Sequence, residues 1–272
     1  MPVTCLLAPP QFMSIWFRKF IHRKDSKLRL FCFPYAGGNA NVFSSWAKYL
    51  PDHVDLFALE SPGRGPRFSE KPIACLKTKV QILRQEIKAF CDLPYIFVGH
   101  SLGALLSFEL ARELQNRGDG NLKHIVLSAK RAPHLPNIKE AIHQLPQKEF
   151  VKQLEKFNFT PHEVIQNHEL MEVVSPMLRA DFSLNETHDF ENTMNLRSDA
   201  TIFWGNQDKI VPFEDTLAWK NLIDGHVDLV TFNDGHFFIS NQEEKFLDEI
   251  NKIIYRQLRK AHVEVSGSIL TS

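Results

Sequence analysis

Short apolar runs alternate with helical patterns along most of the chain. The runs, which we expect to form strands, are Leu28–Phe33, Val54–Leu59, Tyr95–Val98, His124–Ser128, Thr201–Trp204 and Val227–Phe232. Helical patterns lie between most of them, at about 42–50, 78–91, 102–116 and 214–222, and a last one covers Gln242–Arg259. Near-continuous apolar strands that alternate with helices are typical of a mostly parallel sheet covered on both faces. The pattern therefore predicts one α/β domain over residues 28–260.

The alternation lapses over about residues 137–190, where Pro146 and Pro161 each begin a helical pattern and Pro176 interrupts the second. Two or three helices inserted between strands predict a lid over the carboxyl ends of the sheet. Flexible thioethers and aromatic rings adapt to an acyl chain, so we expect an acyl pocket in the lid. Its candidate residues are Met171, Met177, Phe157 and Phe159. The alternative is that these side chains pack the insertion onto the rest of the domain.

The ends of the chain lie outside the alternating pattern. Near the start, aromatic residues recur every four positions beside basic residues, at Phe12, Trp16 and Phe20. This spacing permits a short interfacial helix. We expect instead that residues 1–27 are a flexible extension, or that Met13 is the true initiator, so that removing residues 1–24 leaves activity and solubility intact. Residues 261–272 are expected to be a flexible tail.

Composition narrows the class of function. The chain has 32 Lys and Arg against 32 Asp and Glu, so no overall basic field favours nucleic acid. No apolar stretch is long enough to span a membrane. Its four cysteines, Cys5, Cys32, Cys75 and Cys91, are scattered without metal-ligand spacing. These features predict a cytoplasmic protein with reduced thiols that acts on a small ligand or a docked protein partner. The even charge balance, together with the predicted lid, favours a monomer.

The sequence Gly99-His100-Ser101-Leu102-Gly103 matches the pattern G-x-S-x-G. It lies between a predicted strand and a predicted helix, which is the context of a nucleophile elbow. The two glycines allow the strand and the helix to pack closely there. Ser101 is therefore the candidate nucleophile, and the ring of His100 should point away from it.

A serine nucleophile needs a histidine base and an acid that orients it, and on this kind of sheet they follow the serine in the order acid, then histidine. His236 lies just after the last predicted strand, and Asp208 lies just after the strand before it. Both loops open on the same edge of the sheet as Ser101. We therefore assign His236 as the base and Asp208 as the acid, with Asp234 and Asp215 as alternatives for the acid.

The oxyanion hole of such a site needs two backbone N–H groups. One should come from Leu102, directly after the nucleophile. The second should come from the glycine-containing turn after the first strand, where we choose Ala36 and leave Tyr35 and Gly37 open. The turn does not have the glycine spacing of a dinucleotide site or the lysine of a P-loop.

Together these residues resemble the type II thioesterases of polyketide and nonribosomal peptide assembly lines, and the related medium-chain thioesterase of fatty-acid synthase. The likeness extends from about Leu30 to Asn241. Besides the elbow, it rests on Phe33-Pro34-Tyr35-Ala36-Gly37-Gly38, Pro62-Gly63-Arg64, Arg131-Ala132-Pro133-His134, Leu178-Arg179-Ala180-Asp181-Phe182 and Gly235-His236-Phe237-Phe238. The resemblance implies an α/β-hydrolase fold with a helical lid, the triad Ser101, Asp208 and His236, and oxyanion donors at Ala36 and Leu102.

The expected function is hydrolysis of an acyl thioester carried on the phosphopantetheine arm of an acyl or peptidyl carrier protein. No metal or bound cofactor is expected to take part. Tyr35 and Phe237 are expected to contact substrate beside the lid residues given above. The alternatives are a general carboxylesterase or lipase with the same triad, a lyase or transferase using the same elbow, and a non-catalytic acyl-binding protein. An intact triad argues against the last of these.

Overall fold

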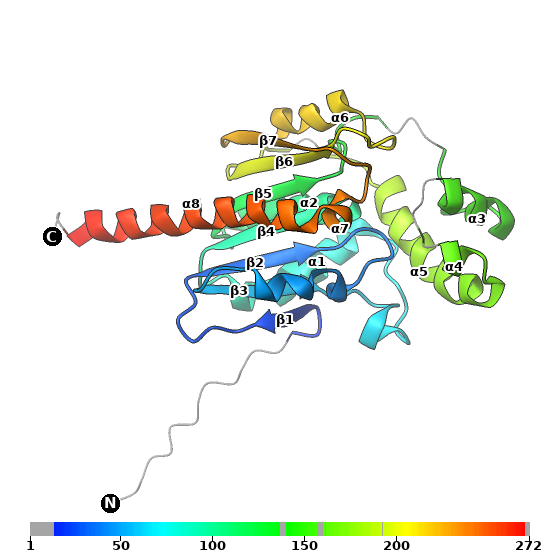
Figure 1. The fold of residues 1–272 in the computed structure, drawn as a ribbon, viewed down its shortest axis with the longest axis horizontal. Helices are drawn as coiled ribbons and strands as arrows, with labels where there is room; N and C mark the ends of the chain where they lie inside the picture. The colour runs from blue at the N-terminus through cyan, green and yellow to red at the C-terminus, as the bar shows by residue number, and fades with distance from the viewer. Residues whose placement is uncertain (1–13, 137–139, 157–159, 161, 192, 270–272) are drawn as a thin grey trace, which may run out of the picture.

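The computed structural model describes residues 14–136, 140–156, 160, 162–191 and 193–269. Its centre is a seven-stranded sheet with strand order β1-β3-β2-β4-β5-β6-β7 (Figure 1). The strands are β1 (Phe17–Ile21), β2 (Leu28–Phe33), β3 (Val54–Leu59), β4 (Tyr95–His100), β5 (Leu122–Ser128), β6 (Asp199–Gly205) and β7 (Val227–Phe232). All pairs from β3 to β7 are parallel, as the sequence predicts. The carboxyl ends of these strands therefore meet at one edge, where sites of such sheets form.

Helices cover both faces of the sheet. The longer ones are α1 (Leu76–Ile87), α2 (Leu102–Arg117) and α8 (Glu243–Ile269), and α6 (Phe213–Leu217) and α7 (Phe238–Asn241) are short. Single 3₁₀ turns are η1 (Ala40–Phe43), η2 (Ser45–Lys48), η3 (Gly65–Arg67), η4 (Lys88–Phe90) and η5 (Ala218–Leu222). In one core, residues of α1 and α2 pack on the sheet, and in the other, residues of η1, η2, α7 and α8 pack on its opposite face.

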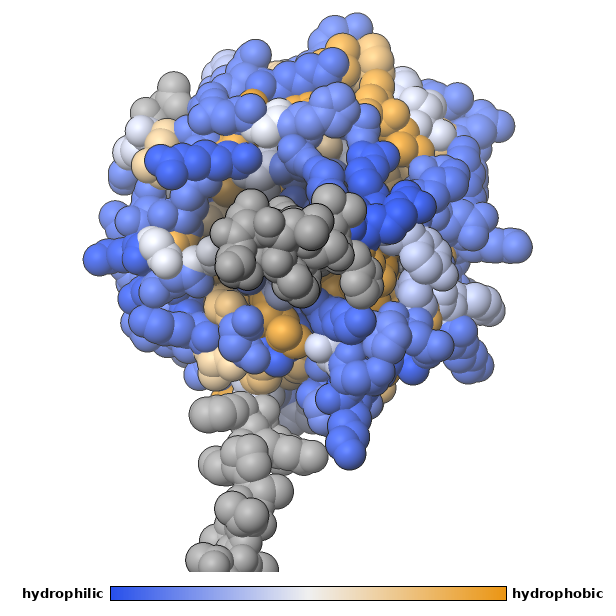
Figure 2. All heavy atoms as spheres, turned by 90° about the vertical axis from the view of Figure 1, so that its left-hand side faces the viewer, coloured by the Kyte–Doolittle hydropathy of each residue, from blue (hydrophilic) through white to orange (hydrophobic). Residues whose placement is uncertain are grey.

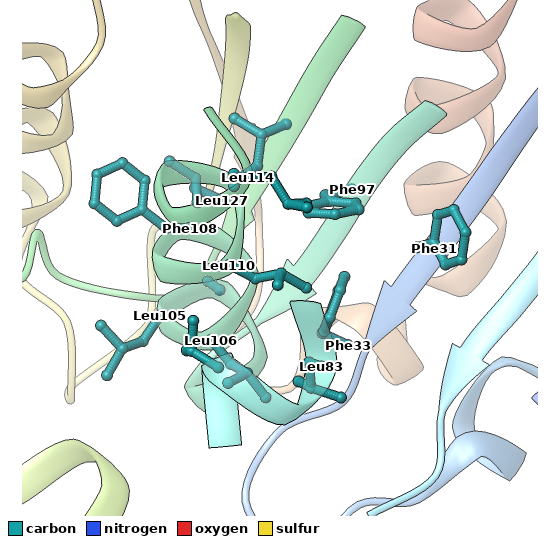
Figure 3. Packing of buried hydrophobic residues seen from close by; sticks show 14 of the residues in the cluster. Phe31, Phe33, Leu83, Phe97, Leu105, Leu106, Phe108, Leu110, Leu114 and Leu127 are labelled. Carbon is teal, nitrogen blue, oxygen red and sulfur yellow. The ribbon is translucent and has the colours of Figure 1, made fainter. Parts of the chain in front are cut away.

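Alternating side chains of the strands supply the two cores. In β2, Phe31 and Phe33 belong to the core under α1 and α2, whereas Leu30 and Cys32 belong to the other. Figure 3 shows Phe33 and Phe97 pointing toward α2, and their rings meet edge to face at a centroid distance of 5.1 Å. Because both faces of the central strands β3 and β4 are buried, these strands form nearly continuous apolar runs, whereas the edge strands β1 and β7 are partly exposed.

The lid forms between β5 and β6, as predicted. Its helices α3 (Gln147–Lys156), α4 (His162–Ile165) and α5 (His168–Glu186) lie beyond the carboxyl ends of the strands (Figure 1). The expectation that Pro176 interrupts the second helical pattern is wrong, because Pro176 lies inside α5. Packing of buried residues on both sides of it, Met171 and Leu178 among them, compensates for the hydrogen bond that a proline cannot donate.

The predictions for the chain ends are wrong where the structure describes them. Residues 17–21 form β1, which pairs antiparallel with β3, and the neighbouring Trp16 is 6% exposed. The flexible extension therefore does not include these residues, and residues 1–13 lie outside the described part. At the other end, α8 continues to Ile269, so the predicted tail from residue 261 is helical over most of its length.

On the side away from the lid, the surface is mostly hydrophilic, with apolar atoms in separate small patches (Figure 2). Within the described residues, no helix is long and apolar enough to cross a membrane. A hollow of about 520 Å³ lies at the opposite end, between the carboxyl edge of the sheet and the lid.

Candidate active site

Ser101 stands on a strained turn between β4 and α2. Its φ is 54° and its ψ is −115°, a conformation that a residue with a side chain rarely adopts. The glycines on either side make this turn possible: a Cβ on Gly99 would lie 2.3 Å from the Gly103 carbonyl oxygen, and one on Gly103 would lie 2.0 Å from that of Phe33. The close packing of β4 on α2 therefore presents the hydroxyl above the edge of the sheet.

The predicted triad comes together at this edge. The Nε2 atom of His236 lies 3.0 Å from Ser101 Oγ, and its Nδ1 atom lies 2.7 Å from Asp208 Oδ2. Asp208 Oδ1 accepts the backbone N–H groups of Ile210 and Val211, which fixes the carboxylate. This network assigns the ring proton of His236 to Nδ1, so that Nε2 accepts the serine proton.

The two alternative acids, Asp215 and Asp234, bind partners other than His236. Asp215 forms an ion pair with Arg131 at 3.0 Å, and Asp234 accepts the N–H of Gly235. The loops after β6 and β7 touch because Gly205 has no side chain: a Cβ there would lie 2.6 Å from the Asp234 carbonyl oxygen. This close approach brings Asp208 to His236.

His100 supports the base, a role that the sequence analysis missed. Its ring is buried and points away from the nucleophile, with Nδ1 2.8 Å from Ser128 Oγ and Nε2 2.9 Å from the carbonyl oxygen of His236. Burial and the neighbouring His236 hold the pKa of His100 well below its usual value. The ring is therefore neutral, donates from Nε2 to the His236 carbonyl and accepts from Ser128.

The turn after β2 pairs the Gly37 and Gly38 amides but leaves the Ala36 amide for the site. Gly37 N–H donates to Asp181 Oδ2 at 2.8 Å, and Gly38 N–H donates to the Tyr35 carbonyl at 2.9 Å. Among the described residues, the Ala36 N–H has no acceptor, and Ala36 lines the same hollow as Leu102 and Ser101. The arrangement favours Ala36 over Gly37 as the second oxyanion donor.

A cavity of about 520 Å³ opens in front of the triad. Its wall includes Tyr35 and Phe237, as predicted, together with Leu145 and Phe182 of the lid region and Val211 beside Asp208. Charged side chains line other parts of the wall, namely Lys130, Arg131, Glu140, Lys156, Asp181, Glu186, Lys209 and Asp215. The cavity thus combines an apolar wall with polar groups, which suits an acyl chain.

Two of the residues predicted to line the acyl pocket, Met171 and Met177, do not line the cavity. Met171 and Met177 pack inside the lid against Phe150 and Leu154 and are absent from the cavity wall. The helical pattern of α5 marked them as buried but did not tell which neighbour buries them. Phe182 lies on the same helix and lines the cavity instead. The other two candidates, Phe157 and Phe159, lie outside the described residues.

A family model described as a thioesterase domain matches residues 28–254 of the chain. The chain belongs to the thioesterase family. Its match to the gramicidin S biosynthesis protein GrsT of Aneurinibacillus migulanus is 35% identical and covers 90% of this chain and 94% of that protein. The medium-chain S-acyl fatty acid synthase thioesterase of Homo sapiens is 27% identical over 89% of this chain and 90% of its own.

Among solved structures, the type II thioesterase BorB from the borrelidin biosynthetic cluster superimposes with a TM-score of 0.80. It is 30% identical, and the match covers 88% of this chain and 97% of that one. The resemblance to type II thioesterases is thereby confirmed, and so is the α/β-hydrolase fold. The strand β1 precedes the residues that the family model matches.

Proposed function

We propose that this thioesterase hydrolyses acyl groups from the phosphopantetheine arm of a carrier protein through an acyl-Ser101 intermediate. The hydrogen-bonded chain from Ser101 through His236 to Asp208, at the floor of a cavity with a partly apolar wall, carries the proposal. Relatives named for biosynthetic clusters, GrsT and BorB among them, support a role in peptide or polyketide assembly.

In the first half-reaction, Ser101 Oγ attacks the thioester carbonyl while its proton moves to His236 Nε2. The new C–O bond gives a tetrahedral intermediate whose oxyanion lies between the N–H groups of Leu102 and Ala36. Asp208 stabilises the imidazolium and keeps the ring oriented. The C–S bond then breaks, and the pantetheine sulfur takes the proton from His236.

In the second half-reaction, a water molecule replaces the thiol beside His236. Its proton moves to Nε2 as its oxygen attacks the acyl-serine carbonyl, and the same two amides stabilise the oxyanion. Collapse of the intermediate returns the proton to Ser101 Oγ and releases the carboxylic acid. The balance is one water consumed for each thioester, with free carrier thiol and acid as products.

Two further features belong to the proposal. We expect the protein to act in the cytoplasm, where thiols stay reduced, and the described cysteines Cys32, Cys75 and Cys91 are free. We also expect it to work as a monomer; the triad is complete within one chain, so the proposed reaction requires no residue of a second copy.

The decisive test is deacylation of a panel of acyl-carrier proteins, followed by intact-protein mass spectrometry. The same acyl groups are offered as p-nitrophenyl esters, and Ser101→Ala is run beside the wild type. Loss of acyl from the carrier that is fast and requires Ser101 supports the proposal. Hydrolysis of the free esters alone makes the protein a general esterase. Transfer of the acyl group to an acceptor other than water makes it a transferase.

A further inference from the structure

A buried ion pair joins the lid to the turn after β2 that carries Ala36, Gly37 and Gly38, which we call the oxyanion turn. Asp181 of α5 is 1% exposed and Arg64 is 7% exposed. The Arg64 guanidinium donates to both carboxylate oxygens of Asp181, from Nη1 at 2.6 Å and from Nη2 at 2.8 Å. Two parallel bonds of this kind fix orientation as well as charge. Neither residue is a member of the triad, so the pair needs another explanation.

Both partners also bind the turn that carries Ala36. Asp181 Oδ2 accepts the Gly37 N–H at 2.8 Å, and Arg64 Nη1 donates to the Gly38 carbonyl at 3.1 Å. The helix presses on the same place, because a Cβ on Gly37 would lie 2.9 Å from a methyl carbon of Leu178. Gly37 has a φ of 80°, so the turn itself requires a glycine there.

Electrostatics keeps the carboxylate charged. Burial alone would raise the pKa of Asp181, but Arg64, Lys79 and the Gly37 N–H outweigh burial and hold that pKa below its usual value. A charged carboxylate accepts stronger hydrogen bonds than a neutral group, so the Gly37 N–H is held firmly. The peptide that follows Ala36 cannot rotate without breaking this bond.

We propose that Asp181, oriented by Arg64, is a positioning residue that aims the Ala36 N–H at the oxyanion. The inference rests on the proposed function, because it matters only if Ala36 stabilises a tetrahedral intermediate. It assigns α5 two roles: Phe182 and Asp181 both line the cavity, and Asp181 also holds the oxyanion turn. A purely structural ion pair would stabilise the fold but would leave turnover by the folded enzyme unchanged.

The test compares Asp181→Asn with the wild type, using steady-state kinetics on an acyl-carrier protein at a temperature where circular dichroism shows both folded. Losing an oxyanion donor costs about 100- to 1000-fold in kcat, so we expect a misaligned one to cost at least about tenfold, with KM nearly unchanged. An alkyl boronic acid, which becomes tetrahedral on Ser101, should lose affinity by a similar factor. A non-hydrolysable acyl-pantetheine thioether, which keeps the ground-state geometry, should not.

The matched control is Glu109→Gln, which removes the carboxylate from another buried arginine, Arg112 of α2. It should lower stability and leave kcat unchanged.

If Asp181→Asn fails to fold, Arg64→Lys replaces it. This variant keeps the charge and the Asp181–Gly37 bond but loses the forked pairing, so a smaller loss confined to kcat is expected.

The outcomes distinguish failure of the positioning role of Asp181 from failure of the proposed thioesterase function. A folded Asp181→Asn or Arg64→Lys with wild-type kcat and wild-type boronic acid affinity overturns the positioning role. Equal weakening of the boronic acid and the thioether also overturns it, because binding in general would then be disturbed. If Ser101→Ala deacylates the carrier at the wild-type rate, the proposed function itself is wrong. A dead Ser101→Ala beside a fully active Asp181→Asn removes the inference alone.

Discussion

Removing residues 1–24 deletes β1 with the buried Phe17, and we expect this truncation to destabilise the fold strongly. Phe17 is 2% exposed, and its ring meets those of Phe31 and Phe33 edge to face at centroid distances of 5.3 and 6.1 Å. β1 also pairs with β3 and so covers one edge of the sheet. Removing residues 1–13 alone leaves each of these contacts in place.

The expected loss of stability is estimated from the burial of the Phe17 ring. Truncating a buried phenylalanine to alanine costs about 3–5 kcal/mol of unfolding free energy. In a protein of this size, 1 kcal/mol lowers Tm by about 2–4 °C, so Phe17→Ala should lower Tm by roughly 6–20 °C. Deleting residues 1–24 also removes Trp16 and the hydrogen bonds of β1, and its effect should be at least as large.

Thermal unfolding followed by circular dichroism measures these shifts. Ile15→Ala is the matched control, because this apolar side chain is two residues away and 66% exposed. Its Tm should stay within about 2 °C of the wild type, as expected for a surface substitution. A truncation of residues 1–24 that melts with the wild type, and retains its activity, would refute the packing of β1 on the sheet.

Three further predictions concern the site and its surroundings. His236→Ala should lower kcat by about 10⁶-fold and Asp208→Ala by about 10⁴-fold, measured on one acyl-carrier substrate; equal losses would contradict the orienting role of the acid. Leu145→Trp should shift the preferred acyl chain toward shorter lengths by filling the cavity, whereas Met177→Leu inside the lid should not, and equal profiles across a chain-length panel would contradict this. Burial lowers the pKa of Lys79 from its ordinary value of 10.5 to about 8 in the folded protein. Between pH 8 and 10.5 the unfolded state therefore binds more protons than the folded state, so the free energy of unfolding should rise with pH. Urea unfolding across this pH range measures the rise, and Lys79→Met should lose the part that Lys79 contributes.

The candidate catalytic centre could be predicted from the sequence because each of its proposed members lies at a recognisable place. Ser101 lies on a strand-to-helix turn between glycines, and Asp208 and His236 each follow a strand directly. In a parallel sheet those positions share one edge, so the order of elements brings the residues together without knowledge of distances. The structure adds the hydrogen bonds that choose Asp208 over its two neighbours.

Other features were not accessible because they depend on packing between distant segments. β1 is short and lies at the edge of the sheet, and its exposed Arg18 and Lys19 resemble a solvated tail. Edge strands commonly carry such charges. On α5, the sequence shows which positions are apolar, but only the docking of the helix decides that Met171 faces the lid while Asp181 reaches the oxyanion turn.

If Asp181 positions the oxyanion turn, its place next to Phe182 on α5 links the fit of a substrate to its turnover. An acyl group that displaced Phe182 would then also shift the carboxylate one residue away on the same helix. A poorly fitting chain then weakens the stabilisation of its own transition state. Selectivity of this origin appears in turnover more than in binding, so competing acyl groups of equal affinity are cleared at different speeds.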